Sequence, residues 1–248
     1  KISSNVIDAG EAGQIDMQDV ADNCIAREKV FYDGHAVAAV AADNAHIAEE
    51  AANLIQVNYQ LLDPVMDVRS AMADNAPVLH DDFLPGAFLA PTEKALPNAS
   101  KLELAMGDIT NGFDEADVVI EREFTTETVH QGYIETHIVT AQWGANGMVT
   151  VWTTTQGQFA IRDQLALVLE LPMSAITVIP LEIGGGFGGK DSIYIDPLAV
   201  VLSKQSGRPV KMVMNRAETL RATGPSSGTY IKARLGVKTD GTLVAAEF

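Results

Sequence analysis

The first third of the chain alternates between strand-like and helix-like patterns of apolar positions. Residues 37–42 form a short apolar run that predicts a strand, and Asp43 is placed to cap the helix that follows. Within residues 47–55 the apolar positions recur at about 3.6-residue spacing, which is typical of an amphipathic helix. Residues 56–59 return to a strand pattern. This order predicts the last part of a small α/β domain, which we place at residues 1–73.

The rest of the chain divides into a linker and a larger domain. Residues 74–100 carry four prolines and little periodicity, and they predict an extended linker. Residues 101–248 combine both patterns and predict one domain of α+β class, in which mixed α/β units are built from β-hairpins and strand–loop–helix connections. The expected strands are 118–126, 138–143, 148–154, 175–179, 211–214, 230–238 and 243–248, and the expected helices are 160–169 and 192–205. The Asp240-Gly241 pair suits a tight turn between the last two strands.

Composition excludes several classes of protein. With 47% hydrophobic and 20% charged residues, the chain is globular rather than disordered. A formal net charge of −16 argues against nucleic acid or an anionic membrane as a partner. No apolar run approaches the ~18 residues of a membrane helix, and the single cysteine, Cys24, forms no internal disulfide. We therefore expect a cytoplasmic protein. The first residue is Lys1, which suggests a fragment or a processed chain.

The most informative segment is Gly184-Gly185-Gly186-Phe187-Gly188-Gly189-Lys190. Five glycines leave the peptide N–H groups of a bend open to a large ligand. The segment follows an expected strand and precedes an expected helix, and such loops commonly bind a phosphate or a phosphorylated cofactor.

Residues alone leave two other interpretations of this loop open. Gly184, Gly189 and Lys190 have the spacing of a phosphate-binding P-loop, which would indicate a nucleotide hydrolase. Asp191 does not fit that motif, because a hydroxyl is needed there to hold Mg²⁺ and a carboxylate would repel the phosphates. Alternatively, the glycines only let two backbones pack closely.

Several segments in the same order resemble one family. The glycine loop is similar to the signature loop of the large, molybdenum-binding subunit of the xanthine dehydrogenase/aldehyde oxidase family of molybdenum hydroxylases. Residues 132–137 (GYIETH) resemble its G-Y-L-E-x-H segment, and residues 153–156 (TTTQ) resemble its S-T-Q segment. Residues 34–40 resemble part of the family's hammerhead domain, although His35 replaces the usual acidic residue. The resemblance implies that residues 1–73 are the C-terminal part of that domain and that 101–248 begin the molybdopterin-binding domain.

The resemblance also implies a cofactor and the residues that bind it. The cofactor would be a Mo-pyranopterin, either molybdopterin or its cytosine dinucleotide form, whose sulfurs hold the metal without protein ligands. Lys190 would neutralise a cofactor phosphate or be solvated. Asp191 stands where xanthine-type members carry a substrate-binding glutamate, so we expect it to bind substrate or else to cap the following helix. The residues expected to bind the cofactor are Gln156, Gly185, Gly186, Phe187 and Gly188.

Glu135 and His137 raise a separate question. On a strand they would face the same way, and with His130 nearby a metal site is conceivable. Two or three ligands without a fourth make a weak case, so we favour a structural role in which Glu135 is buried and hydrogen-bonded.

The function implied is that of a fragment of a molybdenum hydroxylase, which oxidises an N-heterocycle or an aldehyde-type substrate with oxygen from water. The family's general-base glutamate would lie beyond residue 248, so we expect no catalytic residue in this chain and no activity from it alone. Partners would be the remainder of the large subunit and subunits or domains that carry [2Fe–2S] clusters and FAD. The alternatives are a P-loop nucleotide hydrolase and a non-catalytic assembly module.

Overall fold

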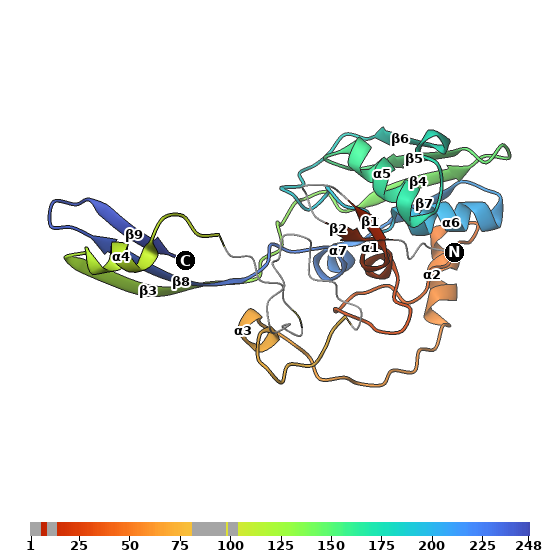
Figure 1. Cartoon of the computed structure of the whole chain (residues 1–248). Coiled ribbons are helices and arrows are strands. Elements are labelled where there is room, and N and C mark those ends of the chain that lie inside the picture. Colours follow the sequence, from red (N-terminus) through yellow and green to blue (C-terminus); the bar gives the residue numbers. More distant parts are fainter. Residues whose placement is uncertain (1–5, 9–13, 81–97, 99–103) are drawn as a thin grey trace. The chain divides into compact units, whose positions relative to one another are not determined.

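The chain is seen in a computed structural model that describes residues 6–8, 14–80, 98 and 104–248 (Figure 1). Its contacts form two compact units, and neither is continuous in sequence. Unit 1 contains residues 1–61 and 130–225, and unit 2 contains residues 62–129 and 226–248. The expected domain boundaries do not coincide with these units and stay a prediction. Most of the expected linker at 74–100 lies outside the described residues.

Unit 1 is built on a mixed four-stranded sheet. Its order is β6 (Ile176–Pro180), β5 (Val149–Thr153), β4 (Ile138–Trp143) and β7 (Val210–Val213). β5 runs parallel to β6, whereas β4 is antiparallel to both β5 and β7. The hairpin and the two further strands expected from the sequence are therefore confirmed. The mixed α/β character of the expected fold class is confirmed with them.

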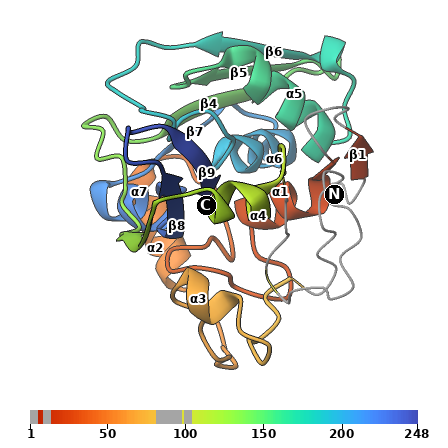
Figure 2. The same cartoon turned by 60° about the vertical axis from the view of Figure 1, so that its left-hand side comes forward.

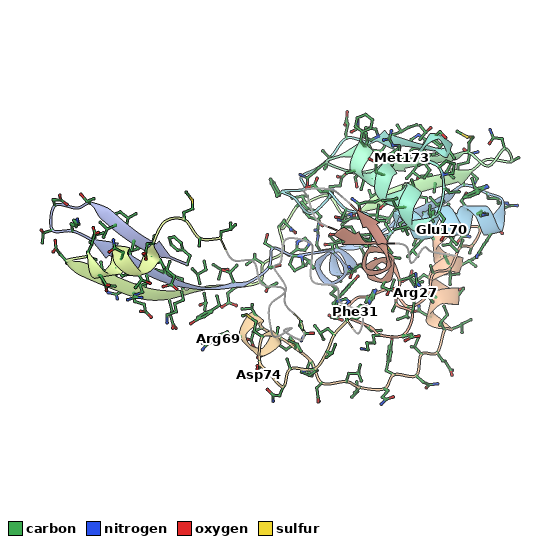
Figure 3. All side chains as sticks on the ribbon, viewed as in Figure 1. Arg27, Phe31, Arg69, Asp74, Glu170 and Met173 are labelled. Atoms are coloured by element: carbon green, nitrogen blue, oxygen red, sulfur yellow. The ribbon has the colours of Figure 1, made fainter. Side chains whose placement is uncertain are left out.

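One face of this sheet carries the core of unit 1. Val139, Ala141, Val149 and Val151 alternate with half-exposed residues and are all buried. Helices α5 (Gln158–Val168) and α6 (Asp196–Ser206) pack against this face, α5 beside β6 and α6 across β4 and β7 (Figure 2). Helix α1 (Met17–Cys24) packs against α5. Glu170 and Met173, whose side chains are labelled in Figure 3, lie in the connection between α5 and β6.

The first sixty residues differ from the expectation in three ways. Residues 37–42 and 56–59 form no strand, because no neighbouring strand among the described residues hydrogen-bonds to them. Helix α2 (Ala45–Asn53) is present, but Asn44 caps it through a bond of 3.0 Å from the Ile47 N–H to Asn44 Oδ1. Asp43 pairs with Arg208 instead. A short hairpin of β1 (Val6–Asp8) and β2 (Gln14–Asp16) precedes α1.

His35, which departs from the family pattern, ties down the loop after α1. Its Nδ1 accepts a hydrogen bond of 3.2 Å from the N–H of Phe31, a residue labelled in Figure 3. Its Nε2 bonds to the carbonyl oxygen of Asp22 and therefore carries the proton. Burial lowers the pKa of His35, so its ring is neutral and donates a hydrogen bond that an ionised carboxylate at this position could not donate.

The helix after the glycine loop begins later than expected, and one further helix in unit 1 was not predicted. The helix expected from residue 192 begins at Asp196, because the Ile193 N–H bonds to Gln164 and the Tyr194 N–H bonds to Asp196. It ends at Gly207 in a left-handed conformation with φ of 64°. Helix α7 (Arg216–Ala222) was not predicted, although a capping box formed by Asn215 and Glu218 starts it.

Unit 2 contains an antiparallel sheet of β3 (Val118–Thr126), β8 (Thr229–Val237) and β9 (Leu243–Glu247). The Asp240-Gly241 turn joins β8 to β9 as expected, with Gly241 at φ of 88°. Helix α4 (Ile109–Asp114) packs on β9, and the single turn α3 (Val68–Ala71) contacts β8. Within the described ranges, no helix combines the length and apolarity needed to cross a membrane.

The core assignment predicts a large effect at Leu165 of α5, which is 0% exposed. Leu165→Ala should lower the free energy of unfolding by about 2–5 kcal/mol, because it removes buried methyl groups and leaves a cavity. Urea unfolding followed by tryptophan fluorescence measures this, since both tryptophans, Trp143 and Trp152, lie in β4 and β5.

The matched control is Leu54→Ala, because Leu54 at the end of α2 is 81% exposed. It should change the free energy by no more than about 0.5 kcal/mol. Equal effects of the two substitutions would contradict the assignment.

Candidate functional site

The glycine loop, residues 184–190, lies against two other segments of unit 1. On one side the Glu135 N–H donates to the Gly184 carbonyl at 3.2 Å. On the other, the Gln156 N–H donates to the Lys190 carbonyl at 3.1 Å. The ends of the loop are thus held to the GYIETH and TTTQ segments. The structure therefore brings together three of the four segments that carried the sequence resemblance.

Gln156 lies directly against the loop. Its side-chain Oε1 accepts hydrogen bonds from the Gly188 N–H at 2.9 Å and from the Lys190 N–H at 3.2 Å. Both donors are backbone amides, so the oxygen must face the loop and the NH₂ group must face away from it. That NH₂ group donates to no described residue, and Gln156 is exposed. The arrangement leaves a neutral donor available to a ligand.

Phe187 and Gly188 form the outer edge of the loop. Their φ angles are 52° and 87°, which puts two consecutive residues in the left-handed region. For Phe187 this backbone is unfavourable by about 1–2 kcal/mol, and the surrounding hydrogen bonds hold it there. Phe187 is 74% exposed, and a Cβ on Gly188 would meet nothing within 4 Å. This edge is open.

Three peptide N–H groups of the loop have no hydrogen-bond acceptor among the described residues. The other four are all used. The Gly184 N–H donates to Glu135, and those of Gly188 and Lys190 donate to Gln156. The Gly189 N–H donates to the Gly186 carbonyl. The N–H groups of residues 185–187 donate to no described residue. Consecutive free amides are the donors expected of an anion-binding bend.

The remaining glycines are needed because the loop closes onto the protein. A Cβ on Gly184 would lie 2.6 Å from Glu135 Cβ, and one on Gly189 would lie 2.7 Å from Tyr133 Cε1. A Cβ on Gly186 would overlap the Gln156 carboxamide. The sequence-based explanation, an open backbone for a bulky ligand, therefore describes only the outer edge. On the inner side, the missing side chains make room for Tyr133, Glu135 and Gln156.

Lys190 is not solvated, so that expectation is wrong, and its ammonium pairs with a carboxylate of the protein, which argues against the expected role of neutralising a phosphate. Its side chain is 0% exposed, and its Nζ lies 2.7 Å from Glu135 Oε2. It also lies 4.9 Å from the centre of the Tyr133 ring. Burial alone would raise the pKa of the Glu135 carboxyl, but hydrogen bonds from Lys190 and the Gly184 N–H hold that pKa below its ordinary value. Glu135 is hydrogen-bonded as expected, but it is only half-buried.

Asp191 does not cap a helix, since α6 begins five residues later and Asp191 is exposed. Its carbonyl accepts from Gln164 of α5 at 3.3 Å, which leaves the carboxylate at the surface beside the loop. The P-loop interpretation does not fit this geometry. Its lysine would have to reach the phosphates and its helix would have to start at the loop, whereas Lys190 is buried and the helix starts at Asp196.

Residues 131–137 form no strand, so Glu135 and His137 do not share a face as expected. Beneath the loop, the Tyr133 hydroxyl bonds to His137 Nε2 at 2.7 Å and to Thr223 Oγ1 at 3.1 Å. Thr223 Oγ1 also bonds to His130 Nε2 at 2.9 Å. No group of three metal-ligating side chains occurs among the described residues, and His130 and His137 are joined through these hydroxyls. The network anchors the segment to α7.

The Glu135–Lys190 pair and the Tyr133 network were missed by sequence reasoning. Glu135 and Lys190 are 55 positions apart, and neither residue type signals a buried pair by itself. The one available signal was the occurrence of both residues inside family motifs.

Comparison with known proteins agrees with this geometry. A family model for the molybdopterin cofactor-binding domain matches residues 92–248, and one for the a/b hammerhead domain of aldehyde oxidase and xanthine dehydrogenase matches residues 3–63. The chain belongs to the molybdenum-binding large subunits of the xanthine dehydrogenase/aldehyde oxidase family.

The matches to individual relatives include almost all of this chain but only part of the length of each relative. The chain is 30% identical over 246 residues to a probable hypoxanthine oxidase of Escherichia coli O157:H7, covering 89% of this chain and 25% of that protein. It is 34% identical over 227 residues to the carbon monoxide dehydrogenase large chain of Afipia carboxidovorans, covering 89% of this chain and 28% of that protein. Reconstituted CO dehydrogenase from Oligotropha carboxidovorans superimposes with a TM-score of 0.78 at 31% identity, over 94% of this chain and 29% of that one.

The buried network predicts a pH dependence. Burial, with smaller contributions from the nearby charges of Lys190 and His130, lowers the pKa of His137 from 6.5 to about 4, although Glu135 opposes the shift. Below pH 6.5 the unfolded chain takes up a proton that the folded protein excludes. This contribution to stability is therefore intact above that pH and is lost as the pH falls toward 4, by up to about 1.4 kcal/mol for each pH unit.

His137→Gln should flatten this slope of unfolding free energy against pH, measured by urea unfolding at pH values from 4.5 to 7.5. His46→Gln is the control, since its side chain on α2 is 80% exposed and contacts none of the network. Equal slopes in the wild type and His137→Gln would show that His137 does not carry the effect.

Proposed function

We propose that unit 1 binds a Mo-pyranopterin cofactor through the loop 184–190 and Gln156, as part of a molybdenum hydroxylase. The observation that carries the proposal is a set of donors on the loop and on the adjacent Gln156 that have no partner among the described residues. The N–H groups of Gly185, Gly186 and Phe187 and the NH₂ group of Gln156 are all without a described partner. Family membership supports the identity of the group they would hold.

The donor set suits such a cofactor chemically. The phosphate and other oxygen acceptors of a pyranopterin would be held by these amide donors without the addition of a charge. Gly188 would contribute close approach, because no protein atom occupies the position of its missing side chain. When bound, the cofactor supplies the two-electron redox chemistry for hydroxylating a substrate carbon with oxygen derived from water. The residues of this chain hold and orient it.

Asp191 is the candidate contact to substrate. Its carboxylate is exposed next to Lys190 at the end of the loop, and an acid there can accept a hydrogen bond from an N-heterocycle. An aldehyde offers no such donor. The curated relatives include proteins named for hypoxanthine, nicotinate and carbon monoxide, and we propose an N-heterocycle or an aldehyde-type substrate without choosing between them.

The rest of the catalytic machinery would come from elsewhere. The chain spans less than a third of the length of the relatives described above. We propose that the general-base glutamate lies in polypeptide beyond residue 248 and that this chain alone is inactive. We further propose that partner subunits or domains carry [2Fe–2S] clusters and FAD, that the cofactor is molybdopterin or its cytosine dinucleotide, and that the enzyme works in the cytoplasm.

The direct test is the molybdenum and pterin content of the purified holoenzyme, measured by mass spectrometry of the metal and by fluorescence of the oxidised pterin. The wild type should hold both. Gln156→Ala should lower both by about tenfold or more, because it removes the acceptor of two loop hydrogen bonds and one free donor.

Gln142→Ala is the matched control, since Gln142 is an exposed glutamine of β4 in the same unit. It should leave both contents unchanged. A wild type without molybdenum and pterin would contradict the proposed function and would favour a non-catalytic assembly module. Equal losses of molybdenum and pterin in the two variants would show that Gln156 has no specific role in binding the cofactor.

A further inference from the structure

The ion pair between Lys190 and Glu135 lies in a buried position, where removing its charges from water is energetically unfavourable. The Lys190 side chain is 0% exposed and the Glu135 side chain is 24% exposed. Removing an ammonium group from water is unfavourable by several kcal/mol, and a buried pair often contributes little net stability compared with apolar residues of similar size. A lysine at this position therefore needs an explanation other than stability.

The carboxylate of Glu135 connects the two ends of the glycine loop. Its Oε2 accepts from the Gly184 N–H at 2.8 Å and from Lys190 Nζ at 2.7 Å. Gly184 is the first residue of the loop and Lys190 is the last. The Glu135 backbone adds a second bond at the Gly184 end of the loop, because its N–H donates to the Gly184 carbonyl at 3.2 Å. The Glu135 side chain thus determines how far apart the first and last residues of the loop lie.

The backbone of Lys190 in turn holds Gln156. Its N–H donates to Gln156 Oε1 at 3.2 Å, and its carbonyl accepts from the Gln156 N–H at 3.1 Å. The same carbonyl accepts from the Thr155 hydroxyl at 3.0 Å. A displacement of Lys190 would therefore move the Gln156 carboxamide and break the bonds that orient it.

We propose that Glu135 and Lys190 are a positioning pair: their ion pair holds the loop in the bent form that leaves the amides of residues 185–187 unpaired and aims the Gln156 NH₂ group away from the loop. The pair does not act by charge on the ligand, because the ammonium is neutralised by Glu135 and shielded from the outer edge. The identity of the ligand rests on the proposed function, whereas the bent loop is a property of the chain itself.

Three variants test the pair. Lys190→Met removes the ammonium and keeps an unbranched side chain in the buried space. Glu135→Gln keeps an acceptor for the Gly184 N–H but leaves the ammonium without a counter-charge. The double variant Lys190→Met/Glu135→Gln removes both charges and restores a neutral interior. Arg208→Met is the control, since it breaks an ion pair in the same unit whose side chains are 74% and 80% exposed.

The first readout needs no cofactor. Hydrogen exchange of the Gly188 and Lys190 amides, measured in the full-length apo protein, should accelerate by about tenfold or more in each single variant, because both amides bond to Gln156. Amides in the buried strand β5 should change by less than about twofold. The double variant should be closer to the wild type than Glu135→Gln is, since no charge is left unpaired.

The second readout is the molybdenum and pterin content of the holoenzyme, which should fall in parallel with the loss of loop protection. Unchanged loop exchange in both single variants would overturn the proposal, as would an equal acceleration of the loop and of β5, which would mean general destabilisation. Faster loop exchange with full cofactor content would also overturn it. If the wild type holds no cofactor, the proposed function fails, but the exchange measurement still decides whether the pair shapes the loop.

Discussion

The site depends on one constraint: the ammonium of Lys190 is buried and must be neutralised by Glu135. Because the two residues come from segments 55 positions apart, satisfying this pair brings the GYIETH segment under the glycine loop. The same carboxylate also receives the first peptide N–H of the loop, so the pairing fixes the loop's span as well as its position. Packing around Tyr133 and the bonds from Gln156 then follow from that placement. The ion pair is better understood as a determinant of geometry than as a source of stability.

The loop has two sides with different physical roles. On the inner side, Gly184, Gly186 and Gly189 lack side chains because Glu135, Gln156 and Tyr133 occupy that space. On the outer side, Phe187 and Gly188 adopt left-handed conformations and leave an open edge. Close packing and ligand access are therefore not competing explanations of a glycine-rich sequence. The packed inner side holds the bend in which the amides of residues 185–187 have no partner among the described residues.

Sequence patterns predicted most of the regular structure of unit 1 and the association of Gln156 with the loop. Those predictions rested on local periodicity and on motif order, which a single sequence contains. The sequence did not predict the buried Lys190–Glu135 pair, because nothing in the residues around a lysine or a glutamate indicates which distant residue it will pair with. The strand expected at Glu135 and His137 was wrong because the regular pairing of β4 with β7 begins only at Ile138, after a single backbone bond from the Met214 N–H to the His137 carbonyl. The strands expected at 37–42 and 56–59 fail for a related reason: strand pairing is a non-local property, and no neighbour among the described residues pairs with these segments.

The most direct test of this account is an experimental structure of the protein with its cofactor bound. The account predicts that the Lys190–Glu135 pair stays closed, that Gln156 Oε1 still accepts from the Gly188 and Lys190 amides, and that the cofactor lies against the outer edge at Phe187 and Gly188. A cofactor bound at another face of unit 1, or a loop opened away from Glu135 and Gln156 to admit it, would contradict it.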